Sequence, residues 1–234
     1  MRTLSQRLGH LLERLFPRLL REMMDDAFVA RTENYGHRTW LGHPIWQNVN
    51  DLWVIQEVIS NLKPSWIIET GTNRGGSSLF YAHLLDLLGH GRILTIDVEK
   101  LHEHRHPRVE YLIGSAASQD IIARVQSTVE LADGPVLVIL DSDHSQAHVS
   151  LELEHYHPFV TPGSYLLVQD GIIDTLPRFA HARPGPLPAI RDFLSRHPEF
   201  QVDDQLCDQF PISHHPQGWL KRLPQAPTAP CPAS

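Results

Sequence analysis

The amino-acid sequence predicts an α/β fold: a doubly wound, mostly parallel sheet of the Rossmann-like type, with a helical extension at the N-terminus. Three observations predict it. Five short apolar segments alternate with segments of helical periodicity between residues 66 and 170. A glycine-rich turn follows the first apolar segment, and several of the others end in an acidic residue. Apolar strands of this length are typical of a parallel sheet that helices cover on both faces.

Size and composition suit one globular domain. The chain has 234 residues, of which 41% are hydrophobic, enough for a full core. The net charge of -7 and the absence of a Lys/Arg block argue against a general nucleic-acid-binding protein. Cys207 and Cys231 form neither a disulfide framework nor a metal-ligand spacing, which favours a reducing, cytoplasmic location. No apolar run approaches the roughly 18 residues of a membrane span, so no transmembrane segment is expected.

Residues 1–38 are expected to form a helical extension. Leucines at helical spacing predict a first helix that Pro17 ends, followed by a second helix from residue 18 to about residue 30. Arginine and glutamate interrupt the leucines, so the segment is not a signal peptide. Its apolar face has two possible uses: packing on the domain or on a second copy of the chain, as in a homo-oligomer, and peripheral contact with a membrane surface. The spacing is set by Leu4, Leu8, Leu11, Leu12 and Leu15.

Residues 39–223 are expected to form the sheet domain. An aromatic loop comes first, then a helix that starts at Asn50 or Asp51 and runs to about Leu62. The predicted strands cover residues 66–70, 92–98, 109–114, 135–141 and 164–170. The predicted helices cover residues 78–89, 118–129, 147–160 and 185–197. Residues 199–205 and 219–223 are expected to close the sheet, and the Pro- and Ala-rich residues 224–234 to be a disordered tail.

The glycine-rich turn "ETGTNRGGSS" after the first strand is the first candidate binding element. Its glycines permit a tight turn and close approach of a ligand to the backbone. The pattern is neither G-x-G-x-x-G nor a phosphate-binding loop, and an acid before the first glycine would repel pyrophosphate but suit a cationic ligand. A turn without a ligand is the alternative. The candidate cofactor-binding residues are Glu69, Gly71, Thr72, Gly75 and Ser77.

The ends of the next strands offer further candidates for the same ligand. An acid at the tip of the second strand commonly accepts hydrogen bonds from ribose hydroxyls, which favours Asp97, with Glu99 second. The small and polar residues after the third strand leave room for a flat base beside Ser115, although Ser118 could equally serve as a helix cap. With Asp141 at the end of the fourth strand, this order of motifs predicts S-adenosylmethionine as the cofactor.

Several separate blocks of the sequence resemble one known family. They are "WLGHPIWQNVNDLWVIQEVISNLKPSWIIETGTNRGGSSLFYA", "LDSDHSQAHVSLELEHYHPFVTPGSYLLVQDG", "GPLPAIRDFLSRHPEFQVDD" and "PQGWLKR". Together they resemble the cephalosporin hydroxylase / rhamnosyl O-methyltransferase family over roughly residues 39–222. The resemblance implies a class I methyltransferase fold and an S-adenosylmethionine-dependent O-methyltransferase, often with a divalent metal. The acceptor it implies is a free hydroxyl of a sugar, glycolipid or other natural product.

Acidic residues at the ends of the fourth and fifth strands predict a metal site. Neighbouring parallel strands lie about 4.8 Å apart, so Asp141 or Asp143 can share a cation with Gln169 and Asp170. Mg²⁺ suits such oxygen ligands. The family usually has Glu-Asp at the second place, and this sequence has Gln169-Asp170. The glutamine keeps an oxygen ligand but removes one negative charge, which should weaken metal binding.

His144, three residues after Asp141, stands where relatives carry a base. Metal coordination would lower the pKa of an acceptor hydroxyl, and His144 could take its proton as the methyl group transfers. A helix-capping or packing role is the alternative for this imidazole. Trp40, Trp46 and Arg178 are candidates to line the acceptor pocket, and residues 170–186 form a long loop suited to a lid.

Three other functions compete with methyl transfer. A metal-dependent hydroxylase needs two histidines and a carboxylate, for which His102, His106 and Asp141 are conceivable ligands. The glycine pattern disfavours a nicotinamide-dependent oxidoreductase. A non-catalytic partner protein that retains the fold is the third, and Gln169 is its best support.

Overall fold

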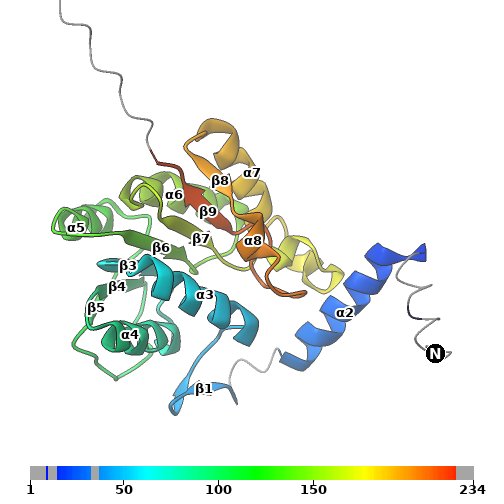
Figure 1. Ribbon diagram of the computed structural model, residues 1–234, viewed down its shortest axis with the longest axis horizontal. Helices are drawn as coiled ribbons and strands as arrows, with labels where there is room; N and C mark the ends of the chain where they lie inside the picture. The colour runs from blue at the N-terminus through cyan, green and yellow to red at the C-terminus, as the bar shows by residue number, and fades with distance from the viewer. Residues whose placement is uncertain (1–8, 10–14, 33–36, 225–234) are drawn as a thin grey trace, which may run out of the picture.

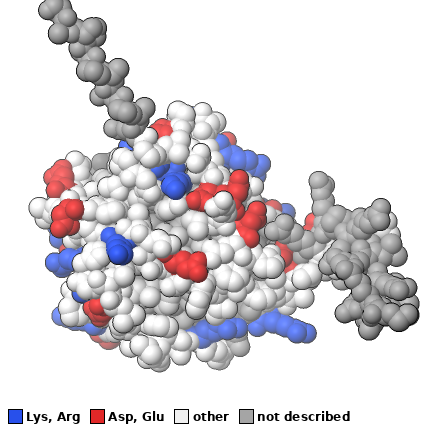
Figure 2. Space-filling view, in the orientation of Figure 1, with Lys and Arg blue, Asp and Glu red and all other residues white. Residues whose placement is uncertain are grey.

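The computed structural model describes residue 9 and residues 15–32 and 37–224. The predicted first helix, residues 4–15, and the predicted tail therefore lie almost wholly outside the described residues. The second N-terminal helix is present as α2, Pro17–Thr32, which confirms the expected start to within one residue. In the part of the chain that is described, no helix combines the length and the apolar character needed to cross a bilayer. Acidic and basic side chains are interspersed over the face shown in Figure 2.

A seven-stranded sheet forms the centre of the molecule and confirms the predicted fold class (Figure 1). Its strand order is β5-β4-β3-β6-β7-β9-β8, and the first five strands of that order are parallel. β9 lies antiparallel to both β7 and β8. The strands are β3 (Trp66–Thr70), β4 (Arg92–Asp97), β5 (Val109–Ile113), β6 (Val136–Leu140), β7 (Tyr165–Val168), β8 (Phe200–Val202) and β9 (Trp219–Arg222).

Helices cover both faces of the sheet, and two apolar clusters lie between them and the strands. The side chains of one strand alternate between the faces, so Ile67 packs in the cluster with α3 and α4, whereas Ile68 packs in the cluster with α5, α6 and α7. The buried strands are thus apolar on both sides, as the sequence predicts. The helices are α3 (Val49–Leu62), α4 (Gly76–Leu88), α5 (Gln119–Val129), α6 (Gln146–Tyr156) and α7 (Pro186–Arg196).

Short elements depart from the sequence prediction. A hairpin, β1 (Thr39–Trp40) with β2 (His43–Pro44), lies in the expected aromatic loop. The expected closing strand over residues 199–205 ends early, because α8 (Asp204–Cys207) begins there. The 3-10 turns η3 (Gly171–Asp174) and η4 (Pro177–Ala182) occupy the expected lid, and η2 (His157–Phe159) continues α6.

Asn48 caps α3, rather than Asn50 or Asp51. The Asn48 Oδ1 accepts the backbone N–H of Asn50 at 2.8 Å, which satisfies one of the free donors at the helix start. The Asp51 carboxylate turns instead towards the 213–214 segment, where it accepts Ser213 Oγ at 2.6 Å and the backbone N–H of His214 at 2.8 Å.

The central strands β3 and β6 bring the glycine-rich turn against the end of the fourth parallel strand. Gly71 follows β3 with φ +86°, and a Cβ there would lie 1.8 Å from the carbonyl oxygen of Asp141. Only glycine fits both the backbone conformation and this close approach. The chain connections that leave the carboxyl ends of β3 and β6 run in opposite directions along the sheet. Parallel α/β sheets bind their ligands at such a reversal of strand order.

Gly71→Ala should destabilise the protein by about 3 kcal/mol or more, because two effects add: alanine disfavours the left-handed backbone conformation, and its Cβ would overlap the Asp141 carbonyl. Gly163→Ala is the matched control. Gly163 has φ +85°, yet a Cβ there would meet nothing within 4 Å. The control should cost about 1–2 kcal/mol. Urea unfolding of both variants measures the difference, and equal losses would contradict the close approach at Gly71.

Candidate active site

Two adjoining cavities open at the carboxyl ends of the parallel strands. One, of about 670 Å³, lies over β4 and β5 and is called here the cofactor-side cavity. The other, of about 410 Å³, lies over β6 and β7 and is called the acceptor-side cavity. Both volumes are in the ordinary range for small-molecule sites. The two cavities share Trp46, Gly71, Asn73, Asp141, Ser142 and His144 as wall residues.

The cofactor-side cavity contains the residues predicted to hold ribose and base. Asp97 lies in its wall, and its Oδ2 accepts the backbone N–H of Asn73 at 2.7 Å, which ties the end of β4 to the glycine-rich turn. Ser115 also lines it, beside Gly114 and Ala116. Ser118 occupies the N-cap position of α5, but its side chain makes no cap hydrogen bond there.

Glu69 lies behind the cavity walls, fully buried under the glycine-rich turn. It accepts hydrogen bonds from Ser77 Oγ at 2.6 Å, Ser78 Oγ at 2.5 Å and Thr95 Oγ1 at 2.7 Å. Burial raises the pKa of this carboxyl, and the three hydroxyls oppose the rise. In this position Glu69 joins the first turn of α4 to β4, so its place in the structure is that of a support for the turn.

The other candidates in the turn distribute between the cavities. Gly71 lines both, whereas Thr72, Gly75 and Ser77 line the acceptor-side cavity. Thr72 Oγ1 lies 2.6 Å from Thr95 Oγ1, which fixes the turn from below.

The segment "HEHRH" lies against the glycine-rich turn, and among the described residues its histidines do not join Asp141 in a group of possible metal ligands, as a hydroxylase site would require. His102 and His104 stack with ring centroids 4.2 Å apart. A Cβ on Gly75, where φ is +72°, would lie 2.4 Å from His104 Nε2. His106 pairs with Asp86 at 3.1 Å, on the outer end of α4.

Asp141, His144 and Asp170 come together in the acceptor-side cavity. Each offers one ligand atom, and these atoms lie within 4.8 Å of one another. His144 Nε2 is 3.1 Å from Asp170 Oδ2. Asp143 stands apart from this group, because its Oδ1 accepts the backbone N–H of Ser145 at 2.7 Å and the residue faces solvent and the cofactor-side cavity. The geometry thus pairs Asp141, and not Asp143, with Asp170.

Gln47 joins the two strand ends, and sequence patterns gave no indication of it. Its Nε2 donates to Asp141 Oδ2 and to Gln169 Oε1, each at 2.8 Å. Gln47 and Gln169 are buried. The amide group of Gln47 therefore links the Asp141 carboxylate to the side-chain oxygen of Gln169.

Two histidines from the loop before β9 complete the surroundings of Asp170. His214 Nδ1 lies 3.6 Å from Asp170 Oδ1, and His215 Nδ1 accepts the backbone N–H of Asp170 at 3.2 Å. His215 Nε2 is 3.8 Å from Asp51 Oδ2. Since Asp170 itself has φ +58°, these contacts hold its backbone in a conformation unusual for a non-glycine residue.

The two carboxyl groups have opposite tendencies to ionise. Burial raises the pKa of Asp141 well above its usual range, and the negative charges of Asp170 and Glu69 add to the rise. Burial also acts to raise the pKa of Asp170, but the imidazoles of His144 and His214 hold it well below its usual value. A bound cation would reverse the penalty on Asp141, because it favours the charged form.

The residues present fit the two groups that the sequence predicts. The donors around Asp141 and Asp170 are carboxylate and amide oxygens, the hard ligands that suit Mg²⁺. The cofactor-side cavity has the size for a nucleoside, with Asp97 and Ser115 in its wall, and Gly71 adds no side chain to that wall.

The acceptor-side cavity has a partly apolar wall. Ile172, Ile173 and Phe179 from the expected lid line it, and Trp46 lies between it and the cofactor-side cavity. Trp40 lies elsewhere, packed edge-on against Phe80 with centroids 4.9 Å apart.

The segment expected to form a lid, residues 170–186, packs against α2. Arg178 NH1 lies 3.5 Å from Asp26 Oδ1, and Val29 packs with Ile172 and Leu176. The second N-terminal helix therefore packs on the segment that walls the acceptor-side cavity.

Comparison with known proteins identifies the family. The model of the Rhamnosyl O-methyltransferase/CmcI family matches residues 33–223. The chain belongs to the rhamnosyl O-methyltransferase/CmcI family. The Rhamnosyl O-methyltransferase of Mycobacterium tuberculosis is 32% identical over 199 residues, which cover 80% of this chain and 81% of the relative. That of Mycobacterium leprae is 30% identical over 194 residues, covering 79% and 82%.

Solved structures of the family share the fold. A CmcI structure with Mg and SAM is 18% identical, with a TM-score of 0.61, over 80% of this chain and 77% of that chain. A CmcI structure with SAH is 15% identical, with a TM-score of 0.56. The resemblance seen in the sequence blocks is thus confirmed, as is the class I methyltransferase fold.

Asp141→Asn should stabilise the metal-free protein at neutral pH, on the order of 1 kcal/mol, because burial and the charge of Asp170 oppose the ionisation of Asp141. The folded-state pKa of Asp141 is raised, so the wild type loses stability relative to the variant as pH rises from about 4 through that pKa. Denaturant unfolding in EDTA at pH 4, 6 and 8 measures the gap. A gap that does not grow with pH would contradict this account of Asp141.

Proposed function

We propose that the chain is an S-adenosylmethionine-dependent O-methyltransferase, assisted by Mg²⁺, that methylates a hydroxyl group of a sugar. The observation that carries the proposal is the meeting of the two cavities at Asp141 and His144. Methyl transfer requires a donor and an acceptor in line and in contact. A cavity for each, with carboxylates and an imidazole at their junction, is the arrangement that this reaction needs.

The cofactor-side cavity would hold S-adenosylmethionine, which supplies an electrophilic methyl group. Asp97 would accept hydrogen bonds from the ribose hydroxyls, since a carboxylate at the tip of this strand is placed for that role. Ser115 would face the base. Gly71 lets the cofactor approach the backbone, and Glu69 would act through the turn that it supports.

Asp141, Gln169 and Asp170 would hold Mg²⁺, which supplies Lewis acidity that makes an acceptor hydroxyl easier to deprotonate. His144 would then take the proton from that hydroxyl at Nδ1, the ring nitrogen that is not paired with Asp170. Asp170 Oδ2, 3.1 Å from Nε2, orients the ring and stabilises its charged form. Gln47 would position Asp141 and Gln169 relative to each other, because its Nε2 donates to both side chains.

The acceptor is proposed to be a deoxyhexose such as a rhamnosyl group, attached to an apolar aglycone. The curated relatives are named rhamnosyl O-methyltransferases. Trp46 offers a ring face for a sugar, and Ile172, Ile173 and Phe179 offer an apolar wall. An alkyl or aryl rhamnoside should therefore have a lower KM than free rhamnose, because its aglycone buries apolar surface.

Calorimetry and a transfer assay test the proposal together. S-adenosylmethionine should bind the purified chain, and its labelled methyl group should appear on an octyl rhamnoside in Mg²⁺ but not in EDTA. Absence of cofactor binding would refute the proposal. Binding without transfer to any of a panel of sugar and natural-product hydroxyls would favour a non-catalytic partner with this fold.

His144→Gln should lower kcat by about 10²–10⁴-fold, the usual contribution of a general base, and leave the Kd for S-adenosylmethionine within about threefold. His90→Gln is the control, because His90 is exposed and lies on the turn before β4, at the edge of the sheet opposite the carboxyl strand ends that carry the cavities. Steady-state kinetics and calorimetry give the two quantities. A wild-type kcat in His144→Gln would remove this imidazole from the proton transfer.

Gln169→Glu should tighten Mg²⁺ binding by roughly tenfold, because it restores a carboxylate to the ligand set. Gln201→Glu changes the net charge equally, but it lies exposed on the edge strand β8 and should leave Mg²⁺ affinity unaltered. Calorimetric titration of both variants with Mg²⁺ measures the difference. Equal affinities in the two variants would mean that residue 169 does not contact the cation.

A further inference from the structure

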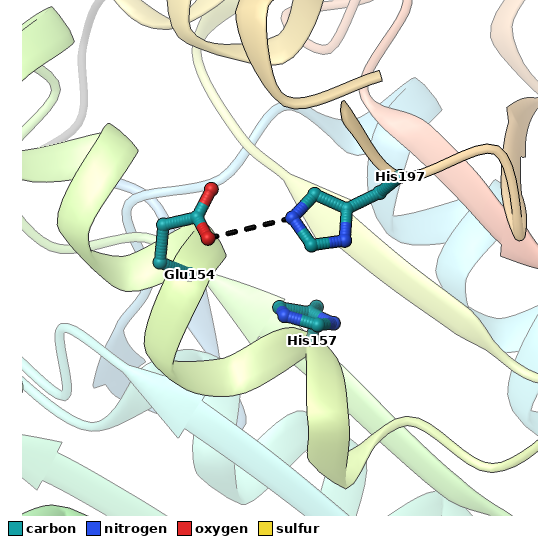
Figure 3. A group of neighbouring side chains, drawn as sticks. All are labelled: Glu154, His157 and His197. Atoms are coloured by element: carbon teal, nitrogen blue, oxygen red, sulfur yellow. Dashed lines mark hydrogen bonds and ion pairs between the residues drawn. The ribbon is translucent and has the colours of Figure 1, made fainter. Parts of the chain in front are cut away.

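A second group of possible metal ligands lies away from the two cavities (Figure 3). It consists of Glu154, His157 and His197, named here the α6–α7 cluster. Glu154 and His157 come from the end of α6, and His197 is the first residue after α7. α6 begins at the strand ends that carry His144 and runs for 11 residues, about 16 Å. The cluster is therefore at the opposite edge of the sheet.

The geometry of the α6–α7 cluster matches that of a metal site. One ligand atom from each residue lies within 4.8 Å of those of the other two. His197 Nε2 is 3.4 Å from Glu154 Oε2, and the two imidazole rings have centroids 4.2 Å apart. The distance between His197 Nε2 and Glu154 Oε2 suits a tetrahedral ion, because two ligand atoms that each lie 2.0–2.1 Å from such an ion are about 3.4 Å apart. Glu154 and His157, three residues apart at a helix end, project on the same side.

A second carboxylate orients one of the imidazoles. Glu199 Oε1 is 3.1 Å from His197 Nδ1, on the side of the ring away from Glu154. A metal-bound histidine almost always donates its other N–H to such a carboxylate or carbonyl, which fixes the ring and its tautomer. Glu199 Oε1 also lies 4.0 Å from His157 Nδ1, a buried nitrogen that makes no hydrogen bond among the described residues.

The charges around the cluster favour a cation in spite of two arginines. α6 and α7 both end here, and each C-terminus contributes partial negative charge. Arg196 contacts Glu154 at Oε1, 2.6 Å away, which leaves Oε2 directed at His197. Arg222 donates to the backbone carbonyls of residues 158 and 160.

We propose that Glu154, His157 and His197 bind a divalent transition-metal ion of the Zn²⁺ type, which clips the end of α6 to the end of α7. Two imidazoles with one carboxylate select such ions over Mg²⁺, and a water can complete a tetrahedral shell. The side chains of both histidines are about one-sixth exposed, at 17% and 16%, so an ion can enter from solvent. The site is independent of the proposed methyl transfer, because it shares no residue with either cavity.

Metal binding by the full-length chain tests the proposal. After removal of metal with EDTA, Zn²⁺ is titrated by calorimetry, and Co²⁺ is added as a visible-absorption probe of a tetrahedral site. Asp170→Asn removes a ligand from the site between the cavities and should retain a Zn²⁺ site with the Co²⁺ bands. His157→Gln/His197→Gln should weaken that site at least about a hundredfold and abolish the bands. At a hundredfold excess over the Kd, Zn²⁺ should raise the Tm of Asp170→Asn by about 5 °C or more.

Two further variants keep the test decisive. Glu154→Gln retains the helix and its packing, and should weaken the site at least about tenfold even if the double variant does not fold. His90→Gln removes an exposed histidine and should change nothing. Equal Zn²⁺ affinity in Asp170→Asn with and without Glu154→Gln would overturn the proposal, as would Co²⁺ bands that persist in the double variant. Binding of equal strength in all variants would show adventitious contact with surface histidines.

Discussion

The partly buried carboxyl pair at the ends of β6 and β7 is the constraint on which the rest of the site depends. Two acids beside a core cannot both ionise without a compensating charge. In this molecule Asp170 keeps its charge because imidazoles surround it, while burial and that charge make Asp141 hard to ionise. Gln47 and His144 hold the pair in place from two other segments. The arrangement costs stability in the metal-free chain, and a cation would recover it.

The sheet topology explains why one pair of acids can serve two cavities. The chain connections from β3 and β6 run towards opposite ends of the strand order, so the cofactor-side cavity lies over one half of the sheet and the acceptor-side cavity over the other. Gly71 makes the close crossing at this point possible, and Glu69 supports the turn from within the core. Substitutions at either residue would therefore act on both cavities at once, through the backbone.

Sequence patterns predict the parts of this structure that local periodicity controls. The apolar runs identify each parallel strand, and strand adjacency predicts that Asp170 meets an acid from the fourth strand. The sequence patterns leave the choice between Asp141 and Asp143 open, because the two residues are only two positions apart. The turn into α6 directs their side chains to different places, and periodicity does not predict that turn. Gln47 and His214 could not be predicted as neighbours of the site, since tertiary folding of irregular segments brings them there. The α6–α7 cluster escapes sequence reasoning for the same reason.

Because burial and the charge of Asp170 oppose the ionisation of Asp141, Mg²⁺ at the proposed site would bind with release of a proton from Asp141. Calorimetric titration with Mg²⁺ in buffers of different ionisation enthalpy measures the protons released per ion bound. Release should approach one proton below the raised pKa of Asp141 and decline towards zero above it. It should be absent in Asp141→Asn at every pH. Mg²⁺ binding with no proton release at any pH, or with equal release in that variant, would contradict the account.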